Sequence, residues 1–324
     1  MGISNSSKVS IIVPTYAQHS KLRRLLRSFD NLKDLLPYEI IVVDDCSPDD
    51  TPIVIKKWMN QEHSFRTQYV RLSENGGPAK ARNAGLKIAI GEIVAFTDSD
   101  CVVDKFWLRE LVTNLDVKAK IIGVGGKVKP LNGGIISKYN TYHKILEPPP
   151  SLLYLVTANC CFMRDAVLAV NGFDEYISKP GGEDVALCIR LYKNGWEFSY
   201  TPEAIVFHDY RNSLRDFIKT FRNYGEGSSY ATKNALEDTL RTRNSFNTSS
   251  ANGSTMDHNT LRPCMFTPKQ VFSYLFWYYK TYRRANLKLY DIVTFSFLRI
   301  VQIIAYAQGW NYGEEVYKDN DKNR

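Results

Sequence analysis

The first hundred residues alternate short apolar runs with segments of helical spacing, and this alternation constrains the fold more than any other feature. An amphipathic segment follows each of the first three runs; between the first two, Leu22, Leu25 and Leu26 recur at helical intervals. Strands that alternate with such helices predict an α/β fold, here a Rossmann-like, mostly parallel sheet with helices on both faces. The four predicted strands cover residues 9–13, 39–43, 68–72 and 92–97.

Each predicted strand is followed by a polar cluster. In an open α/β sheet the carboxyl ends of parallel strands lie on one edge, and ligands bind at that edge. Clusters that are far apart in the sequence are therefore expected to meet in one crevice. The four clusters are Pro14-Thr15-Tyr16, Asp44-Asp45, Asn75-Gly76-Gly77 and Asp98-Ser99-Asp100.

Two acidic residues, Asp98 and Asp100, follow the fourth strand with Ser99 between them. Carboxylates one residue apart on a turn can hold a hard cation such as Mg²⁺ or Mn²⁺ and leave coordination positions open for diphosphate oxygens. A solvated acidic turn has the same sequence, but the ligand edge of the sheet favours a site. His208 ends a later strand, where an imidazole is either a satisfied structural group or a further metal ligand.

Polar residues after the second and third strands point to a bound nucleotide or anion. Asp44 can accept a hydrogen bond from a base N–H or a ribose hydroxyl, although this stretch also caps the helix predicted at 51–60. A pair of glycines then precedes a helix that carries Lys80 and Arg82 on its first turns. This arrangement favours an anion at the helix N-terminus.

Two further carboxylates, Glu183 and Asp184, follow a glycine pair at the start of a helix predicted to reach about Asn194. Acidic residues at this position are ordinary helix caps. A helix-start carboxylate that faces a cleft can also accept a proton from an attacking hydroxyl.

These motifs occur in the order seen in family 2 glycosyltransferases, which the chain resembles from residue 9 to about residue 224. The resemblance implies a GT-A fold and an inverting transfer from a nucleotide-diphosphate sugar, with a UDP-sugar as the first choice. It rests on five segments: Val13-Pro14-Thr15-Tyr16, Val42-Val43-Asp44-Asp45-Cys46-Ser47, Gly77-Pro78-Ala79-Lys80-Ala81-Arg82-Asn83, Thr97-Asp98-Ser99-Asp100 and Gly182-Glu183-Asp184.

The resemblance also implies roles for single residues. Asp184 would be the catalytic base, and Glu183 would orient the acceptor. The implied ligands of the Mn²⁺ or Mg²⁺ ion are Asp98, Asp100 and His208. The implied donor-binding residues are Pro14, Thr15, Tyr16, Asp44, Lys80, Arg82, Asp98 and Ser99.

The chain departs from the family pattern at two positions. The family often has Asn after the first Tyr, where this chain has Ala17. It often has Gly after the paired Asp, where this chain has Cys46. Neither departure changes a predicted catalytic atom.

Two other classes of function stay open on the sequence. One is a sugar nucleotidyltransferase, which would release pyrophosphate, and the other is an inactive glycan-binding or scaffold protein of the same fold. The net charge of +8 favours an anionic partner, but the basic residues follow no recognition motif, so no nucleic-acid partner is expected. The glycines at 123–126 lack the rest of a dinucleotide fingerprint, which argues against a nicotinamide enzyme.

Composition divides the chain into three predicted regions. Residues 132–150 are predicted to be rich in loop structure, and 198–201 and 204–207 to be two short strands. A tail from Gly313 is predicted to fray. The first predicted region is a GT-A catalytic domain over 1–230, with a nucleotide part at about 8–130 and an acceptor part at about 131–230. A mobile linker is predicted over 231–262. The third region is a helical extension over 263–324, with apolar helices at 270–284 and 291–306.

The helical extension is basic and rich in aromatic residues. Seven basic residues and one acidic residue lie between positions 262 and 299, a composition that suits a lipid headgroup surface. Arg299, Gln302 and Gln308 would be costly at the centre of a bilayer, so the expectation is a surface-bound enzyme with a glycan or lipid-linked acceptor. Packing on the catalytic domain, or a homodimer interface, is an equal alternative. The scattered cysteines and the lack of an apolar leader favour the cytoplasm, including its membrane surface.

Overall fold

The computed structural model describes residues 8–33, 38–235, 277–278, 280–283, 285 and 287–320. Contacts divide the chain into two compact units. The first unit consists of Met1–Asn132, Lys144–Lys179 and Glu183–Tyr210, and the second of Gly133–His143, Pro180–Gly182 and Arg211–Arg324.

The first unit is built on an eight-stranded mixed sheet in the order β3-β2-β1-β4-β7-β6-β8-β5. The first four strands of this order are parallel to one another, and β6 is parallel to β8. β7 runs antiparallel to both of its neighbours, and β5 antiparallel to β8. The strands are β1 Val9–Thr15, β2 Tyr38–Asp44, β3 Arg66–Arg71, β4 Ile93–Thr97, β5 Cys101–Val103, β6 Ile121–Pro130, β7 Asn159–Met163 and β8 Glu197–His208.

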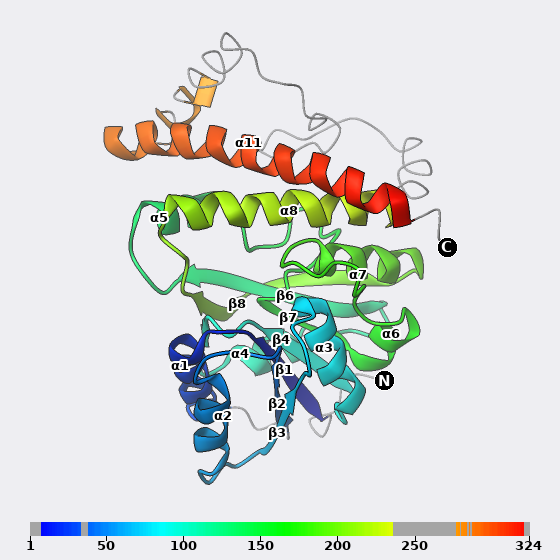
Figure 1. The fold of residues 1–324 in the computed structure, drawn as a ribbon. Coiled ribbons are helices and arrows are strands. Elements are labelled where there is room, and N and C mark those ends of the chain that lie inside the picture. Colours follow the sequence, from blue (N-terminus) through cyan, green and yellow to red (C-terminus); the bar gives the residue numbers. More distant parts are fainter. Residues whose placement is uncertain are drawn as a thin grey trace. The chain divides into compact units, whose positions relative to one another are not determined.

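Helices cover both faces of this sheet, which confirms the predicted layers (Figure 1). The strand residues alternate between two cores: Ile11 and Val13 belong to one, and Ile12 belongs to the other. Burial on both faces explains why β1 and β4 are continuous apolar runs. One core includes α1 His19–Phe29, α2 Thr51–Met59 and α4 Trp107–Val112, and the other includes α3 Gly77–Ile88, α6 Arg164–Ala169 and α7 Glu183–Lys193.

The two short strands predicted after α7 form one strand, β8. Its pairing with β6 jumps from Thr201 opposite Gly126 to Ile205 opposite Lys127. The residues skipped by this irregularity include Pro202, which has no N–H to donate to a neighbouring strand. The apolar sequence pattern is interrupted at these residues, although strand β8 continues through them.

The second unit contains α5 Ile135–Tyr142, α8 Leu214–Ala235 and α11 Leu289–Asn320. The loop-rich stretch predicted over 132–150 has turns and coil on both sides of α5, and the prediction missed this helix. Tyr139 of this short helix packs edge-on against Phe217 of α8 and Phe295 of α11. Such long-range contacts stabilise helices that are too short to form by propensity alone.

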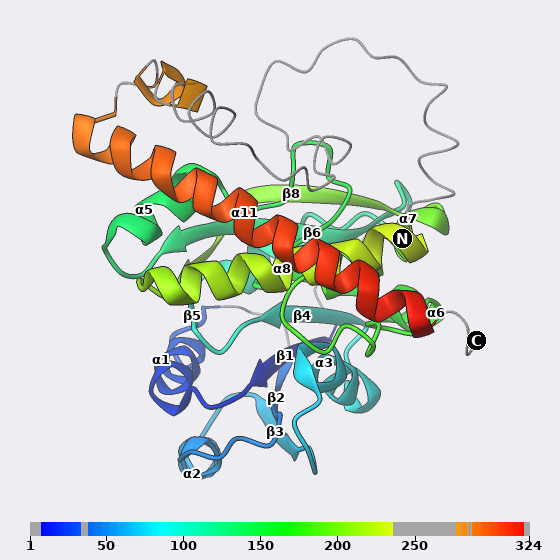
Figure 2. The same cartoon turned by 45° about the horizontal axis from the view of Figure 1, so that its top comes forward.

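The prediction that the chain frays from Gly313 was wrong, because α11 continues to Asn320. A Cβ atom added at Gly313 would lie 2.1 Å from Ser229 Oγ, so this glycine serves a close approach between α11 and α8. Figures 1 and 2 both show these two helices side by side. Of the predicted linker over 231–262, the residues beyond Ala235 lie outside the described part of the chain. Most of the helix predicted over 270–284 lies outside it as well.

Candidate active site

The adjacent ends of β1 and β2 bring Thr15 and Asp44 together, since these residues are paired in register. Both are buried, and Asp44 has no exposed surface. Oδ1 of Asp44 accepts a hydrogen bond from Ser47 N at 2.8 Å, and Oδ2 accepts from Tyr69 Oη and Arg71 Nη1, each at 3.0 Å. The arginine side chain is 41% exposed, so its cation lies beside Asp44 and remains accessible from solvent.

The turn after each of these strands has a residue in the left-handed region, Ala17 at φ 50° and Cys46 at φ 61°. Ala17 N donates to Ser47 Oγ at 2.9 Å, which ties the two turns together. Asn and Gly adopt this conformation most easily, and these are the residues that the family often has at the two positions. Beside them, Pro14 is buried within β1 and Tyr16 is 45% exposed.

The anion expected at the N-terminus of α3 is a side chain of the protein itself. Asp45 accepts hydrogen bonds from Gly76 N at 2.7 Å and Gly77 N at 2.8 Å. Burial raises the pKa of Asp45, against the lowering effect of these two N–H groups. Lys80 lies at the surface and pairs with Glu74 at 2.9 Å.

Arg82 joins two of the predicted motifs. Its Nη2 lies 2.8 Å from Asp98 Oδ1, after β4, and its Nη1 lies 2.8 Å from Glu183 Oε1, at the start of α7. The guanidinium is buried, and its Cζ lies 5.6 Å from the centre of the Phe173 ring. Burial raises the pKa of Asp98, and the nearby Asp100 adds to this, although Arg82 acts in the opposite direction.

Asp184 directly follows the buried Glu183 in α7 and is itself half-buried. It accepts hydrogen bonds from its neighbour Val185 N at 2.8 Å and from the backbone of Thr157. Burial, followed by the charge of Glu183, raises the pKa of Asp184 to about 7. A carboxylate with a pKa near neutrality is well matched to accept a proton at neutral pH.

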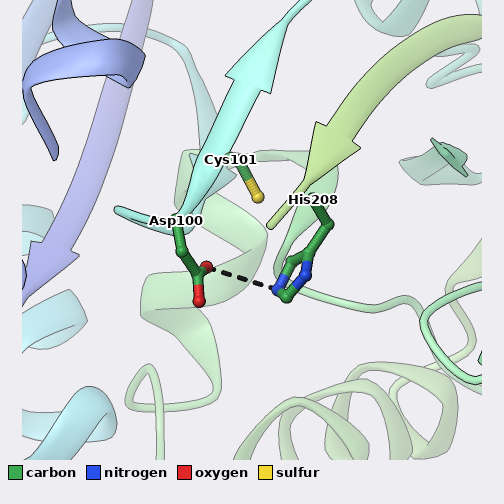
Figure 3. A group of neighbouring side chains, drawn as sticks. All are labelled: Asp100, Cys101 and His208. Atoms are coloured by element: carbon green, nitrogen blue, oxygen red, sulfur yellow. Dashed lines mark ion pairs between the residues drawn. The ribbon is translucent and has the colours of Figure 1, made fainter. Parts of the chain in front are cut away.

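The turn after β4 also approaches the end of β8, where Asp100, Cys101 and His208 meet (Figure 3). Asp100 Oδ1 lies 3.3 Å from His208 Nε2, and the candidate ligand atoms of the three side chains lie within 4.8 Å of one another. Burial raises the pKa of the Cys101 thiol well above its usual range, so it stays protonated. The usable donors are thus a carboxylate and an imidazole, which fit Mn²⁺ better than Mg²⁺ because Mg²⁺ prefers oxygen.

The charge on His208 is set by two opposing effects. Burial lowers its pKa, but the negative charge of Asp100 and the hydrogen bond to it outweigh this, so the pKa is raised overall. Its Nδ1 is buried without a hydrogen-bond partner among the residues described. Ser99, predicted to bind the donor, is buried in the same turn, while Asp98 is paired with Arg82.

The positions of Lys21 and Asp209 beside this cluster were not predicted from the sequence. Lys21 Nζ, from α1, lies 3.8 Å from Asp100 Oδ2 and donates to the backbone oxygen of Asp209 at 3.0 Å. Arg24 of the same helix forms an ion pair with the Asp209 carboxylate. The position of Asp209 directly after His208 was the one available signal, and Lys21 had none.

Comparison with known families gives two overlapping matches. The model described as "Glycosyl transferase family 2" matches residues 10–168, and the one described as "Glycosyl transferase family group 2" matches residues 93–308. Together they cover all of the residues predicted for the catalytic and metal sites.

Several curated proteins resemble the chain. A pre-mycofactocin glycosyltransferase of Mycobacterium tuberculosis is 31% identical over 232 residues, which are 67% of this chain and 46% of that protein. The poly(ribitol-phosphate) beta-N-acetylglucosaminyltransferase TarS of Staphylococcus aureus is 36% identical over 132 residues, 38% of this chain and 22% of TarS. The chain spans about half the length of these relatives or less.

Solved structures resemble it over nearly its whole length. The mannosyltransferase PcManGT from Pyrobaculum calidifontis, in complex with GDP-Man and Mn²⁺, has a TM-score of 0.63 at 18% identity and covers 94% of this chain and 88% of that one. Residues 1–349 of S. aureus TarS, in complex with UDP-GlcNAc, have a TM-score of 0.50 at 21% identity, with 97% and 92% covered. At these identities the likeness concerns the fold, and it confirms the predicted GT-A arrangement.

Proposed function

The chain belongs to glycosyltransferase family 2, and on this basis we propose that it transfers a sugar from a nucleotide-diphosphate sugar to an acceptor hydroxyl with inversion. The observation that carries the proposal is the Arg82 bridge. It joins Asp98 after β4 to Glu183 at the start of α7, directly before a carboxylate whose pKa is about 7. One buried cation thereby holds a donor-side carboxylate and the residue that directly precedes the proposed proton acceptor.

In the proposed reaction Asp184 accepts the proton of the acceptor hydroxyl as its oxygen attacks the anomeric carbon. The bond between that carbon and the diphosphate breaks on the opposite side, which inverts the anomeric centre. Glu183, fixed by Arg82, orients the acceptor. The catalytic domain proposed for this reaction consists of residues 1–230.

The donor would bind along the ends of β1, β2 and β4. Asp44, held by its three donors, would accept from the base or ribose, and the exposed Tyr16 would cover the nucleotide. Lys80 and Arg82 supply positive charge along α3, and the remaining donor-binding residues proposed are Pro14, Thr15, Asp98 and Ser99.

The donors at the Asp100–His208 cluster support a Mn²⁺ site, to which Asp98 would contribute its carboxylate. A bound Mn²⁺ would neutralise the charge that develops on the leaving diphosphate. That PcManGT is described with GDP-Man and Mn²⁺, and TarS with UDP-GlcNAc, supports the same ligand classes here. A UDP-sugar is the donor proposed, and a GDP-sugar is the alternative to test.

The proposal is tested by screening UDP- and GDP-sugars with Mn²⁺ by thermal shift, followed by product analysis for the donors that bind. Transfer predicts release of a nucleoside diphosphate and a product with the opposite anomeric configuration. Pyrophosphate release would identify a sugar nucleotidyltransferase instead. Donor binding without any turnover would favour an inactive glycan-binding protein, and retained configuration would contradict inversion.

A further inference from the structure

Helix α11 has one face packed within the second unit. Gly309 and Gly313 approach α8 closely, since an added Cβ would lie 1.8 Å from Arg222 O and 2.1 Å from Ser229 Oγ, respectively. The buried side chains on this face are Ile292, Phe295, Leu298, Gln302, Ala305 and Tyr306. Because higher numbers on one helix meet higher numbers on the other, α8 and α11 run in the same direction (Figure 2).

Two polar side chains within the apolar part of α11, Arg299 and Gln302, lie on this packed face. Arg299 Nη1 donates to Gln302 Oε1 at 3.0 Å, and Tyr139 of α5 also donates to that oxygen. The Arg299 guanidinium lies 5.8 Å from the centre of the Tyr278 ring. These two side chains, which would be costly in lipid, are therefore turned toward protein.

Another face of α11 is exposed and mostly apolar, and it includes the polar Gln308. Its residues recur every three or four positions or every second turn, so they form one row along the helix. Their side chains are between 37% and 70% exposed: Tyr290, Val293, Phe297, Ile304, Tyr312 and Val316. The helix has the length and composition to cross a membrane over Leu289–Val316, yet 39% of its most apolar stretch is buried. The row extends from Tyr290 to Val316, so it is about 40 Å long along the helix.

The charges around this row are predominantly basic. Lys280, Arg283 and Lys288 are exposed just before α11, and α8 exposes three more cations, Arg215, Lys219 and Arg222. Among the α11 side chains that the structure describes, the exposed acidic ones are Glu314 and Glu315, near its C-terminal end. A self-complementary pairing of two copies would need acidic surface to match six cations, whereas an anionic lipid surface supplies it.

We propose that the exposed row of α11 lies in the headgroup region of an anionic membrane. Val293 and Phe297 insert at the basic N-terminal end, and Arg283 and Lys288 contact lipid phosphates. The helix does not span the bilayer, because the neighbouring α8 would then carry its exposed cations Arg215, Lys219 and Arg222 into hydrocarbon. This proposal extends the proposed function by placing the acceptor, a lipid-linked hydroxyl, at a membrane. Only the statement about the acceptor rests on the proposed function.

The test is co-sedimentation of the full chain with vesicles of phosphatidylcholine alone or with about a third of phosphatidylglycerol. The double variant Val293→Ser, Phe297→Ser should lower binding to the anionic vesicles more than about tenfold, because the depth of insertion depends on apolar area. The matched control is Ile53→Ser, Leu168→Ser, which removes side chains of similar exposure from helices of the first unit and should leave binding unchanged. Arg283→Gln, Lys288→Gln should reduce the salt-sensitive part of binding.

Several outcomes would overturn the proposal. They are an absence of pelleting at low salt, equal binding by the Val293–Phe297 variant and the wild type, and resistance to extraction by alkaline carbonate, which would indicate a span. A dimer in solution that the same variant dissociates, without vesicle binding, would assign the row to a second copy. Hydrolysis of the nucleotide sugar by the soluble protein, measured in parallel, reports on the proposed function independently of membrane binding.

Discussion

Two acidic pairs at strand ends, Asp44–Asp45 after β2 and Asp98–Asp100 after β4, have nearly the same sequence signature and very different surroundings. Asp44 and Asp45 accept three hydrogen bonds from backbone N–H groups of residues that follow them, and Asp44 also pairs with Tyr69 and Arg71 of β3. Asp98 and Asp100 instead face cationic or titratable side chains from other elements, namely Arg82, His208 and Lys21.

The difference lies in what a ligand can replace. A backbone N–H cannot leave a carboxylate without a change in the local turn, whereas a partly exposed side chain such as Lys21 beside Asp100 can turn away when another cation arrives. The first pair is therefore suited to fixed shape and the second to exchangeable charge. A carboxylate at the end of a strand therefore does not by itself indicate a reactive site. Its hydrogen-bond and ion-pair partners must be known as well.

The largest expected effect concerns two carboxylates: Asp184, which is proposed to accept a proton, and Asp45, which holds a turn in place. Asp184→Asn keeps the side-chain shape but cannot accept a proton, so kcat should fall by roughly 10²–10⁴ while donor affinity changes little. Asp45→Asn should leave kcat nearly unchanged and instead lower the free energy of unfolding by about 1–3 kcal/mol, because an NH₂ group replaces one of the two carboxylate oxygens and cannot accept from Gly76 N or Gly77 N. Steady-state kinetics and urea unfolding measure both. Near wild-type turnover in Asp184→Asn would mean that another residue is the base.

Two arginines that pair with strand-end carboxylates give the next comparison. Arg82→Gln removes a buried cation from Asp98 and Glu183, so the free energy of unfolding should fall by about 3–5 kcal/mol. Arg71→Gln removes a 41% exposed cation from Asp44, whose other donors remain, and should lower the free energy of unfolding much less. Denaturant titration of both variants decides this. Equal losses would show that Arg82 is not the shared support of the two motifs.

The pH profile sharpens the distinction further. With a pKa of about 7, Asp184 is protonated below neutrality, so kcat/KM should fall about tenfold per pH unit below 7. Stability has the opposite trend. A carboxyl whose pKa is raised in the folded protein contributes stability that is present below its unfolded pKa of about 4 and lost as the pH rises through about 7.

The variant Asp184→Asn provides the control for both trends. Compared with the wild type it should become relatively more stable between about pH 5 and 8, and the two should converge toward pH 4. A profile of kcat/KM that is flat between pH 5 and 7 would contradict the assignment of Asp184.

The smallest expected effect concerns the turns beside the first pair. Ala17→Gly relieves a left-handed backbone at φ 50° and should stabilise the protein by up to about 1 kcal/mol. The same substitution inside a helix, Ala84→Gly in α3, should destabilise it by about 1 kcal/mol. Thermal or urea unfolding of the two variants gives the signs. A loss of stability in both would mean that the backbone at Ala17 is not strained.

Periodicity was sufficient to predict the layered sheet because β1, β2 and β4 are buried on both faces and α1 presents one apolar face. It failed where long-range contacts outweigh local pattern. Tyr139 holds α5 in a stretch that resembles a loop, and Gly313 resembles a helix terminator although it lies within α11. The domain boundaries predicted at 230 and 262 stay predictions.

The residues of the candidate site could be predicted from the sequence, but the ion pairs between them could not. Asp98 and Glu183 were identified by their positions after a strand and before a helix. Their common partner Arg82 lies 16 and 101 residues away in the sequence, respectively, so no local pattern links the three. For the same reason the approach of Lys21 to Asp100 could not be foreseen.

The most direct test of the central claim, that the acidic pair after β4 is the exchangeable one, is the Mn²⁺ dependence of nucleoside diphosphate release from a nucleotide sugar. The wild type should show saturable activation by Mn²⁺ and lose activity in excess chelator. Asp100→Ala should remove most activity at every Mn²⁺ concentration while its unfolding transition remains cooperative, because Asp100 is one of the two donors at the cluster. Full activity of the wild type in excess chelator, or Mn²⁺ activation of Asp100→Ala equal to that of the wild type, would contradict the account.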